Sequence, residues 1–408
     1  MTRSWRVNYM ALWVSQLVAM LAFSAALPFL PLFIYDLGVS DAREAAAWAG
    51  VLGFVNGFTM AVMAPIWGTM ADRYGRKPMV VRAMLGGGVV VGAMGLVASI
   101  WQLLALRVVQ GGFSGTVAAA RVLAASIVPR ERLGSAIGFL ATAAFIGTSI
   151  GPLFGGVIAD QFGYRACFFA TGALMLVAGL VTIVLVQERF ERAESSAQRP
   201  GFRASLSLLR ARPDLNTLLL SIFLVQVGQM AVSPILPLFV LELTDGAAVA
   251  STTGTILGIT AVSSALSAAV AGRIGDQIGH RRVLIVCALG ASALYIPQAF
   301  ALAPWHLLVL RAGLGVFIGG LIPTAMAMIG LATPTQNRGA IFGLTATAMA
   351  LGNAFGPLLG AAAATVFGLR VAFLTTSIIL AAGGVWVAIR AREADAHLTE
   401  TTPSPPES

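Results

Sequence analysis

Three arginines lie inside long apolar stretches of this sequence, where a charge is costly. Arg107, Arg121 and Arg311 are flanked by runs of Leu, Val, Ala and Gly. An arginine at the centre of a membrane helix costs roughly 2.5–3.5 kcal/mol, so it usually faces protein or a watery cavity. A cation in a region of low dielectric constant attracts an anion strongly. The alternative for each is that the side chain extends to the nearest membrane surface.

Residues for covalent or metal chemistry are scarce. The chain has three His and two Cys residues, and they form no cluster with the spacing of metal ligands. No phosphate-binding loop motif is present, which argues against ATP hydrolysis. We therefore expect no enzymatic activity, no cofactor and no metal.

The elements that carry the arginines are predicted to be transmembrane helices. The chain is 58% hydrophobic and 11% charged, with a mean hydropathy of +0.86, whereas soluble proteins carry about 25% charged residues. Apolar runs near the roughly 20 residues that a membrane-spanning helix needs recur along the whole chain. Twelve spans are predicted, over residues 9–35, 48–70, 79–99, 102–128, 133–160, 165–187, 214–241, 250–272, 282–302, 305–331, 338–366 and 369–390. The fold class is an all-α membrane protein.

The two halves of the chain repeat one another. "GTMADRYGRKP" at 68–78 returns as "GRIGDQIGHRR" at 272–282, which places Asp72 and Asp276 204 positions apart, and further matches keep nearly the same offset. This indicates two six-helix bundles, residues 1–187 and 214–392. A polar, arginine-rich cytoplasmic linker over 188–213 joins them, and the tail over 393–408 is expected to be disordered and cytoplasmic.

The positive charges predict the orientation. Most of the 26 Lys and Arg residues fall beside the termini and every second loop, and such cations favour the cytoplasmic side. Both termini are thus expected in the cytoplasm. Since this topology accounts for the net charge of +9, we expect no nucleic-acid partner.

Several motifs resemble the major facilitator superfamily over nearly the whole chain. "GTMADRYGRKP" resembles the signature of its loop between spans two and three, "LRVVQGGFSG" resembles its span-four arginine motif, and "GTSIGPLFGG" in span five is similar to the signature of its exporters. "LPFLPLF" and the layout look most like the drug/proton antiporters, especially MdtG-type bacterial multidrug exporters. The resemblance implies a monomer in the bacterial inner membrane that exports hydrophobic or amphiphilic molecules in exchange for protons by alternating access. A metabolite carrier, either an uptake symporter or a dedicated exporter, and a non-transporting membrane sensor remain open.

The duplicated loop is expected to gate one side of the membrane. Glycine permits a tight turn, and a carboxylate beside arginines or a helix N-terminus can latch two helices together. The alternative is an ordinary cation-rich turn. The gating candidates in this motif are Gly68, Asp72, Arg73, Gly75, Arg76 and Asp276.

Span five carries glycines at a spacing of four residues. Gly147, Gly151 and Gly155 form a smooth stripe that lets another helix approach closely, and Pro152 favours a kink. Gly356 and Pro357 repeat the pattern in span eleven. The resemblance implies that these residues let the halves rock and seal against leakage, and passive packing is the alternative.

The resemblance assigns proton coupling to Arg107. We find no acidic residue near the middle of any predicted span. Asp36, at the outer end of span one, is a second coupling candidate, although the sequence favours interfacial solvation as its role.

The expected substrate surface is apolar with few hydrogen-bonding groups, which favours an amphiphile over a sugar. Arg121 would attract anionic substrates if span four lines the cavity, as the resemblance implies. The other candidates for contact with substrate are Phe23, Ser24, Asn56, Gln226, Gln229 and Met230.

Overall fold

The computed structural model describes residues 5–188, 213–244, 246, 248–333 and 338–390, and this part of the chain contains helices and no strand. The first half comprises α1 (Trp5–Ala26), η1 (Leu27–Phe29), α2 (Leu30–Asp36), α3 (Ala42–Tyr74), α4 (Lys77–Met94), α5 (Ile100–Phe113), α6 (Thr116–Ile127), η2 (Arg130–Arg132), α7 (Leu133–Phe162) and α8 (Tyr164–Leu185). The second half comprises α10 (Pro213–Ala231), α11 (Ile235–Leu243), α12 (Val249–Ile278), α13 (His280–Gln298), α14 (Pro304–Ala332), α15 (Arg338–Phe367) and α16 (Leu369–Arg390). Most of the predicted linker and the predicted tail lie outside the described residues.

The all-α membrane architecture is confirmed. Within the described residues, 11 helical segments are long and apolar enough to cross a membrane. The remaining predicted span, the ninth (282–302), corresponds to α13, which has 19 residues and begins with His280, Arg281 and Arg282. These polar residues lower its mean hydropathy, but α13 packs along α14 and α16 like its repeat equivalent α4 along α5 and α8.

Three predicted spans are interrupted rather than continuous. Span one breaks at η1, where Pro28 and Pro31 remove backbone donors, and span seven breaks before α11 in the same way at Pro234. Span four breaks between α5 and α6, where Gly115 adopts a φ of +108°. A left-handed residue ends the helical hydrogen-bond ladder, and glycine adopts this conformation without steric cost.

The repeat is visible in matching contacts at one end of the two halves. Phe33 packs on Phe168 with ring centroids 4.9 Å apart, and Phe239 packs on Phe373 at 5.2 Å. An arginine lies over the first ring of each pair, Arg165 in one half and Arg370 in the other. Positions about 205 residues apart therefore occupy equivalent places in three dimensions.

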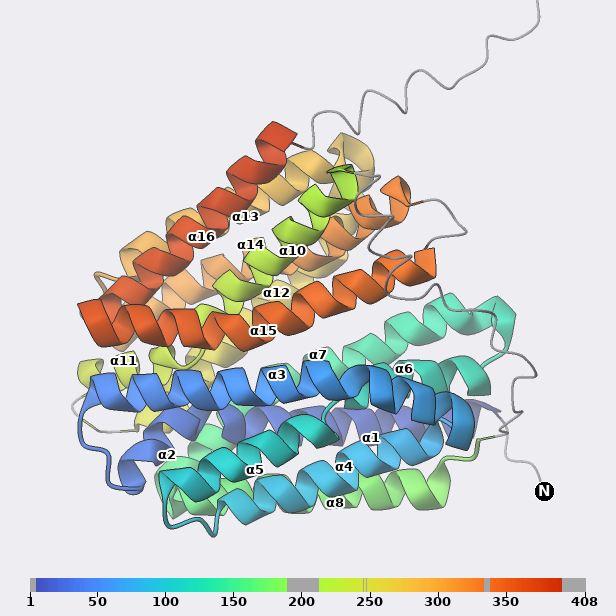
Figure 1. The fold of residues 1–408 in the computed structure, drawn as a ribbon, viewed down its shortest axis with the longest axis horizontal. Helices are drawn as coiled ribbons and strands as arrows, with labels where there is room; N and C mark the ends of the chain where they lie inside the picture. The colour runs from blue at the N-terminus through green and yellow to red at the C-terminus, as the bar shows by residue number, and fades with distance from the viewer. Residues whose placement is uncertain (1–4, 189–212, 245, 247, 334–337, 391–408) are drawn as a thin grey trace, which may run out of the picture.

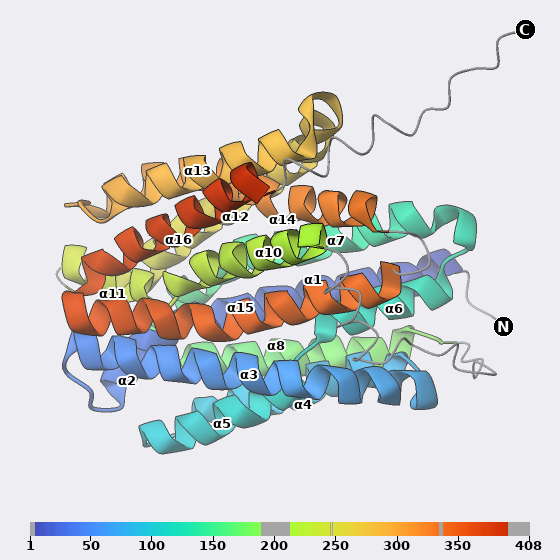
Figure 2. The same ribbon diagram turned by 45° about the horizontal axis from the view of Figure 1, so that its top comes forward.

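The halves meet along two seams, α3 against α15 and α7 against α12. In Figures 1 and 2, α3 and α15 lie side by side near α2 and α11 and diverge toward the end where the N-terminus lies. We call the end that holds α2 and α11 the closed end and the opposite end, which holds the turns at Gly75 and Gly279, the open end.

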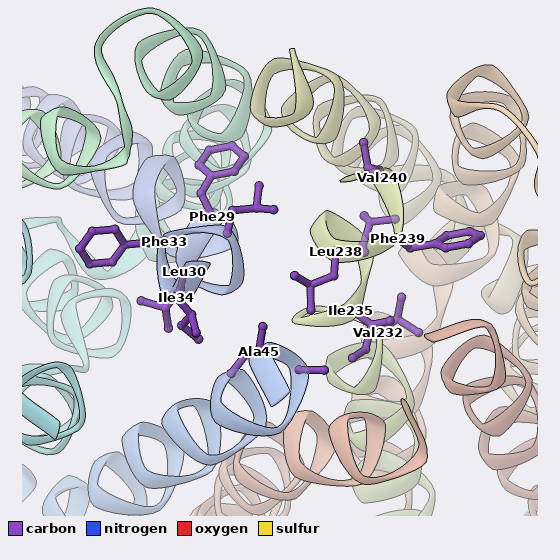
Figure 3. Close-up of a cluster of buried hydrophobic side chains, with 14 of the residues drawn as sticks. Phe29, Leu30, Phe33, Ile34, Ala45, Val232, Ile235, Leu238, Phe239 and Val240 are labelled. Atoms are coloured by element: carbon purple, nitrogen blue, oxygen red, sulfur yellow. The ribbon is translucent and has the colours of Figure 1, made fainter. Parts of the chain in front are cut away.

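An apolar cluster shuts the closed end (Figure 3). Phe29, Leu30 and Ile34 come from the first half, Ile235 and Leu238 come from the second, and all are at most 4% exposed. The two sets belong to one contiguous cluster that also contains Ala45 of α3 and Val232. Burial of each large apolar side chain contributes about 1.5–3 kcal/mol where it removes the side chain from water, so this cluster holds the halves together at the closed end.

Candidate functional site

The first copy of the duplicated loop forms a capped turn at the open end. Gly75 adopts a φ of +100°, which explains the glycine. The carboxylate of Glu188, three residues after the end of α8, accepts hydrogen bonds from the backbone N–H groups of Arg76 (2.9 Å) and Lys77 (2.7 Å), the N-cap and the first residue of α4. Arg73 lies over the ring of Tyr74, while Gly68 lines a neighbouring cavity. The side chain of Asp72 lies outside the described part of the structure, so its latch stays a prediction.

The second copy differs at the position of the cation. Gly279 adopts a φ of +96°, and Asp276 Oδ1 of α12 lies 3.2 Å from Nε2 of His280, the first residue of α13. Asp276 is 75% exposed at its side chain. Asp276 therefore contacts a residue of the same turn, His280, which stands at the position that Arg76 has in the first copy.

Arg82 supports the break in span four. Its guanidinium donates to the carbonyls of Gly112 (2.9 Å) and Ser114 (3.3 Å) at the end of α5. Trp67 Nε1 donates to Gly112 O at 2.6 Å, and the Arg82 guanidinium carbon lies 3.7 Å from the Trp67 ring centroid. The last carbonyls of a helix lack intrahelical partners, so these two side chains satisfy groups that the break exposes.

The repeats differ in the cavity beside this break. Between α3, α4 and α6 lies a cavity of about 230 Å³ whose lining includes Trp67, Arg76 and Arg82. The equivalent cavity between α12, α13 and α14 is about 510 Å³, and Ala271 and Val286 stand at the places of Trp67 and Arg82. α14 is continuous there. The arginine is thus present only in the half whose helix is broken.

Arg107 is buried at the start of span four, with 7% of its surface exposed. Its Nε donates to Leu52 O of α3 at 3.3 Å, and its Nη1 donates to Gln110 Oε1. Asn56 Nδ2 in turn donates to Arg107 O (3.2 Å) and Gln110 Oε1 (3.4 Å). Within the described residues no carboxylate pairs with Arg107. Neutral oxygen atoms therefore solvate this charge and tie α5 to α3, and Asn56 belongs to this network.

Arg311 occupies the equivalent position in α14 but is poorly bonded. It is 6% exposed, and its Nε and one terminal nitrogen have no hydrogen-bond partner within the described residues. Its guanidinium carbon lies 5.6 Å from the Tyr295 ring centroid. The aromatic face offers an electrostatic contact, but the polar network around Arg107 has no counterpart here.

Arg121 lies on α6 in the open-end half of span four, and its side chain is exposed. It lines a small recess between α1, α6 and α7 together with Gln16, Leu140 and Ala144. The Gln16 side chain is 1% exposed, and neither its oxygen nor its nitrogen has a partner in the described structure. Arg121 and an unpaired amide thus share one recess, a relationship that the sequence did not reveal.

The remaining substrate candidates fall into packed and partly open positions. Ser24 Oγ bonds to carbonyls of its own helix and to Gly147 O at 3.0 Å. Gln226 Nε2 donates to Asn353 Oδ1 at 2.7 Å, which links α10 to α15. Phe23, Gln229 and Met230 are half-buried. Their roles toward substrate stay predictions.

The glycine stripes pack within each half rather than between the halves. A Cβ at Gly151 or Gly155 would overlap backbone oxygen atoms of α1, and one at Gly147 would lie 2.7 Å from Met20 Cβ. In the second half, a Cβ at Gly356 would lie 2.6 Å from Met230 Cβ of α10. The stripes therefore let spans five and eleven approach spans one and seven at backbone distance.

The contact between the halves uses other faces of the same helices. A Cβ at Gly254 of α12 would overlap the carbonyl of Pro152, and one at Gly53 of α3 would lie 2.8 Å from Pro357 Cβ. Both predicted prolines thus lie on the seams. The predicted role in rocking and sealing remains a prediction.

Asp36 and Asp160 are acidic residues at the closed end. Asp36 ends α2 with an exposed side chain. Asp160, which the sequence analysis did not single out, bonds to the start of α12 in the other half. A signal that could have pointed to Asp160 is Ala248, the residue before α12, whose side chain accepts no hydrogen bond.

Comparison with known proteins shows which family has this architecture. The family model described as Major Facilitator Superfamily matches residues 12–250 and 218–407. The chain is 38% identical over 392 residues to a multidrug resistance protein MdtG of Dickeya zeae, covering 95% of each chain. It is 34% identical over 392 residues to the MdtG of an Escherichia coli strain, covering 95% of this chain and 96% of the relative.

Solved structures agree in fold. A bacterial homologue of the human lysosomal transporter Spinster, in an inward-facing and occupied conformation, covers 100% of each chain with a TM-score of 0.81 and 16% identity. The nucleoside transporter NupG covers 94% of this chain and 99% of its own, with a TM-score of 0.80 and 11% identity. With its repeated helices, its broken fourth span and a family match over most of its length, this chain belongs to the Major Facilitator Superfamily.

Proposed function

We propose that this protein exports drugs or amphiphilic small molecules across the bacterial inner membrane, as a monomer, by alternating access in exchange for protons. The identity to multidrug resistance proteins over about 95% of both chains is the observation that carries the substrate class. One chain supplies both halves of the pathway, which supports a monomer as the transporting unit.

The distribution of charge supports an orientation with the open end in the cytoplasm. Arg6, Arg73, Lys77, Arg281 and Arg282 all lie at the open end, in or beside its turns. Cations near span ends favour the cytoplasmic side. The described structure is then an inward-open state, with both termini in the cytoplasm and the apolar cluster at Phe29 and Leu238 facing outward.

The proposed cycle moves the two halves as units about the middle of the seams. In the inward-open state a substrate reaches the surface near Arg121 and Gln16 from the cytoplasm. Separation of the closed end and contact at the open end would then expose it to the other side. Arg107 and Asp36 are the proposed coupling residues, and the gating residues of the duplicated loop would stabilise the second state.

The direct test is efflux in inverted membrane vesicles. Vesicles that contain the protein should accumulate one or more compounds from a panel of antibiotics and amphiphiles when their interior is made acidic. Vesicles with the Arg107→Ala protein, at equal expression, serve as the control. If no compound accumulates but a small metabolite does, the carrier belongs to the metabolite class instead.

A further inference from the structure

The first turn of α12 has no cap of its own. The helix begins at Val249 after Ala248, whose φ is +49° and whose methyl group accepts no hydrogen bond. The first N–H groups of a helix lack intrahelical acceptors, and Ser, Thr, Asp or Asn usually supplies one. The repeat equivalent α3 follows this rule, because Asp41 accepts from Glu44 N at 3.2 Å.

The acceptor for α12 comes from the opposite half of the chain. Asp160, in the last turn of α7, accepts from Ala250 N at 3.1 Å through Oδ1 and from Ser251 N at 2.7 Å through Oδ2. A carboxylate at a helix N-terminus gains from both the hydrogen bonds and the partial positive charge of that end. One side chain therefore satisfies two backbone donors across the seam.

This contact lies on a tightly packed part of the seam. A Cβ at Gly156, one turn before Asp160, would overlap the carbonyl of Ala250, and one at Gly258 would lie 3.0 Å from Ser149 O. In the proposed cycle, the backbones of α7 and α12 separate here when the closed end opens. The cap of α12 is then lost, and its two N–H groups must find other partners.

We infer that Asp160 is a latch residue, which stabilises the state with the closed end shut by capping α12 from the other half. This inference rests on the proposed alternating-access cycle and names the residue that biases it. The latch acts on the side of the membrane opposite to the duplicated loop.

The second seam lacks an equivalent charge. Thr365 of α15 occupies the place of Asp160, and its hydroxyl lies 3.4 Å from Arg43 O and 2.7 Å from Ala361 O of its own helix. A neutral hydroxyl already bonded within its own helix adds little to that seam. The latch is thus confined to the seam between α7 and α12.

The test measures the distance across the closed end by electron paramagnetic resonance in lipid nanodiscs. Spin labels are attached at Leu96→Cys and Leu302→Cys, two exposed positions in closed-end loops of opposite halves, after Cys167→Ala and Cys287→Ala. Asp160→Ala should raise the ratio of the long-distance to the short-distance population about fivefold, the typical effect of losing one helix N-cap.

Two control variants match the latch in chemistry or position. Asp41→Ala removes a cap within one half, and Thr365→Val removes the hydroxyl on the other seam. Both should leave the ratio unchanged. An effect of Asp160→Ala no larger than that of Asp41→Ala would overturn the inference.

A second variant removes the donor rather than the acceptor. Ser251→Pro deletes the N–H that Asp160 accepts, at a first-turn position where proline is tolerated, and should shift the ratio in the same direction. Ser251→Ala keeps the N–H and should not. A shifted ratio with no transported compound would support the latch and refute the exporter. Transport with an unshifted ratio in both Asp160→Ala and Ser251→Pro would refute the latch and support the exporter.

Discussion

Arg82 and Trp67 form one stacked pair whose two side chains donate to the same carbonyl. The guanidinium carbon lies 3.7 Å from the indole centroid, and both residues bond to Gly112 O. This pair stands directly against the break between α5 and α6. The conformation of span four, which carries both Arg107 and Arg121, thus depends on a residue of span three.

Removal of this support should destabilise the protein. Arg82→Leu leaves Gly112 O with one donor and removes the donor to Ser114 O. Because hydrogen bonds to charged groups contribute about 1.5–3 kcal/mol, we expect a loss of that order for the pair, seen as a lower midpoint in thermal unfolding in detergent. Val286→Ala, at the equivalent place in the other half, should change the midpoint much less. Equal midpoints for Arg82→Leu and the native protein would contradict the role of Arg82.

The glycine stripe of α7 should be intolerant of a single methyl group. Gly155→Ala places a Cβ against Ala25 O of α1, and such overpacking costs about 1–3 kcal/mol. Gly138→Ala on the same helix meets open space and should leave the unfolding midpoint nearly unchanged. Similar midpoints for the two variants would show that α1 and α7 yield easily at this contact.

A methyl group on the seam should act on the conformational state instead. Gly254→Ala meets Pro152 O of the opposite half, so it should favour separation of the closed end. Labelling of a cysteine introduced at Leu238, in the closed apolar cluster, should become faster by about an order of magnitude if the separation costs about 1.4 kcal/mol less. Gly155→Ala serves as the control, since its contact lies within one half. A seam that is already flexible would give equal labelling rates in the two variants.

Arg121 should select substrates by charge. Arg121→Gln keeps hydrogen-bonding capacity but deletes a positive charge, so efflux of anionic amphiphiles should fall several-fold while neutral compounds are retained. Arg132→Gln removes an exposed charge at the same end and should affect both classes equally little. Equal loss for neutral and anionic compounds would indicate a structural role, and no loss for either would mean that Arg121 only meets solvent.

The sequence was most informative where a single residue type decides the structure. Gly75 and Gly279 were expected at tight turns, and both take positive φ values. The offset of about 204 residues predicted equivalent helices, and the pairs Phe33–Phe168 and Phe239–Phe373 bear this out. These features depend on local chemistry or on direct comparison of the halves.

The features that were missed depend on contacts between distant segments. "GGFSGT" in span four is compatible with a continuous helix, and its break requires the donors of Arg82 and Trp67 from two other helices. The glycine stripe predicted a close approach but not its partner, which is α1. Nothing in the sequence near Asp160 pointed to it, because its two donors lie 90 and 91 positions away.

Proton-driven export is the central claim, and purified protein in liposomes with an acidic lumen tests it most directly. With one transported compound from the vesicle panel, we expect accumulation inside the liposomes above the external concentration. It should disappear when an ionophore collapses the pH gradient, and it should be absent with Arg107→Ala. Simple equilibration of the compound, or accumulation that is unchanged by the loss of the pH gradient, would contradict proton-coupled export.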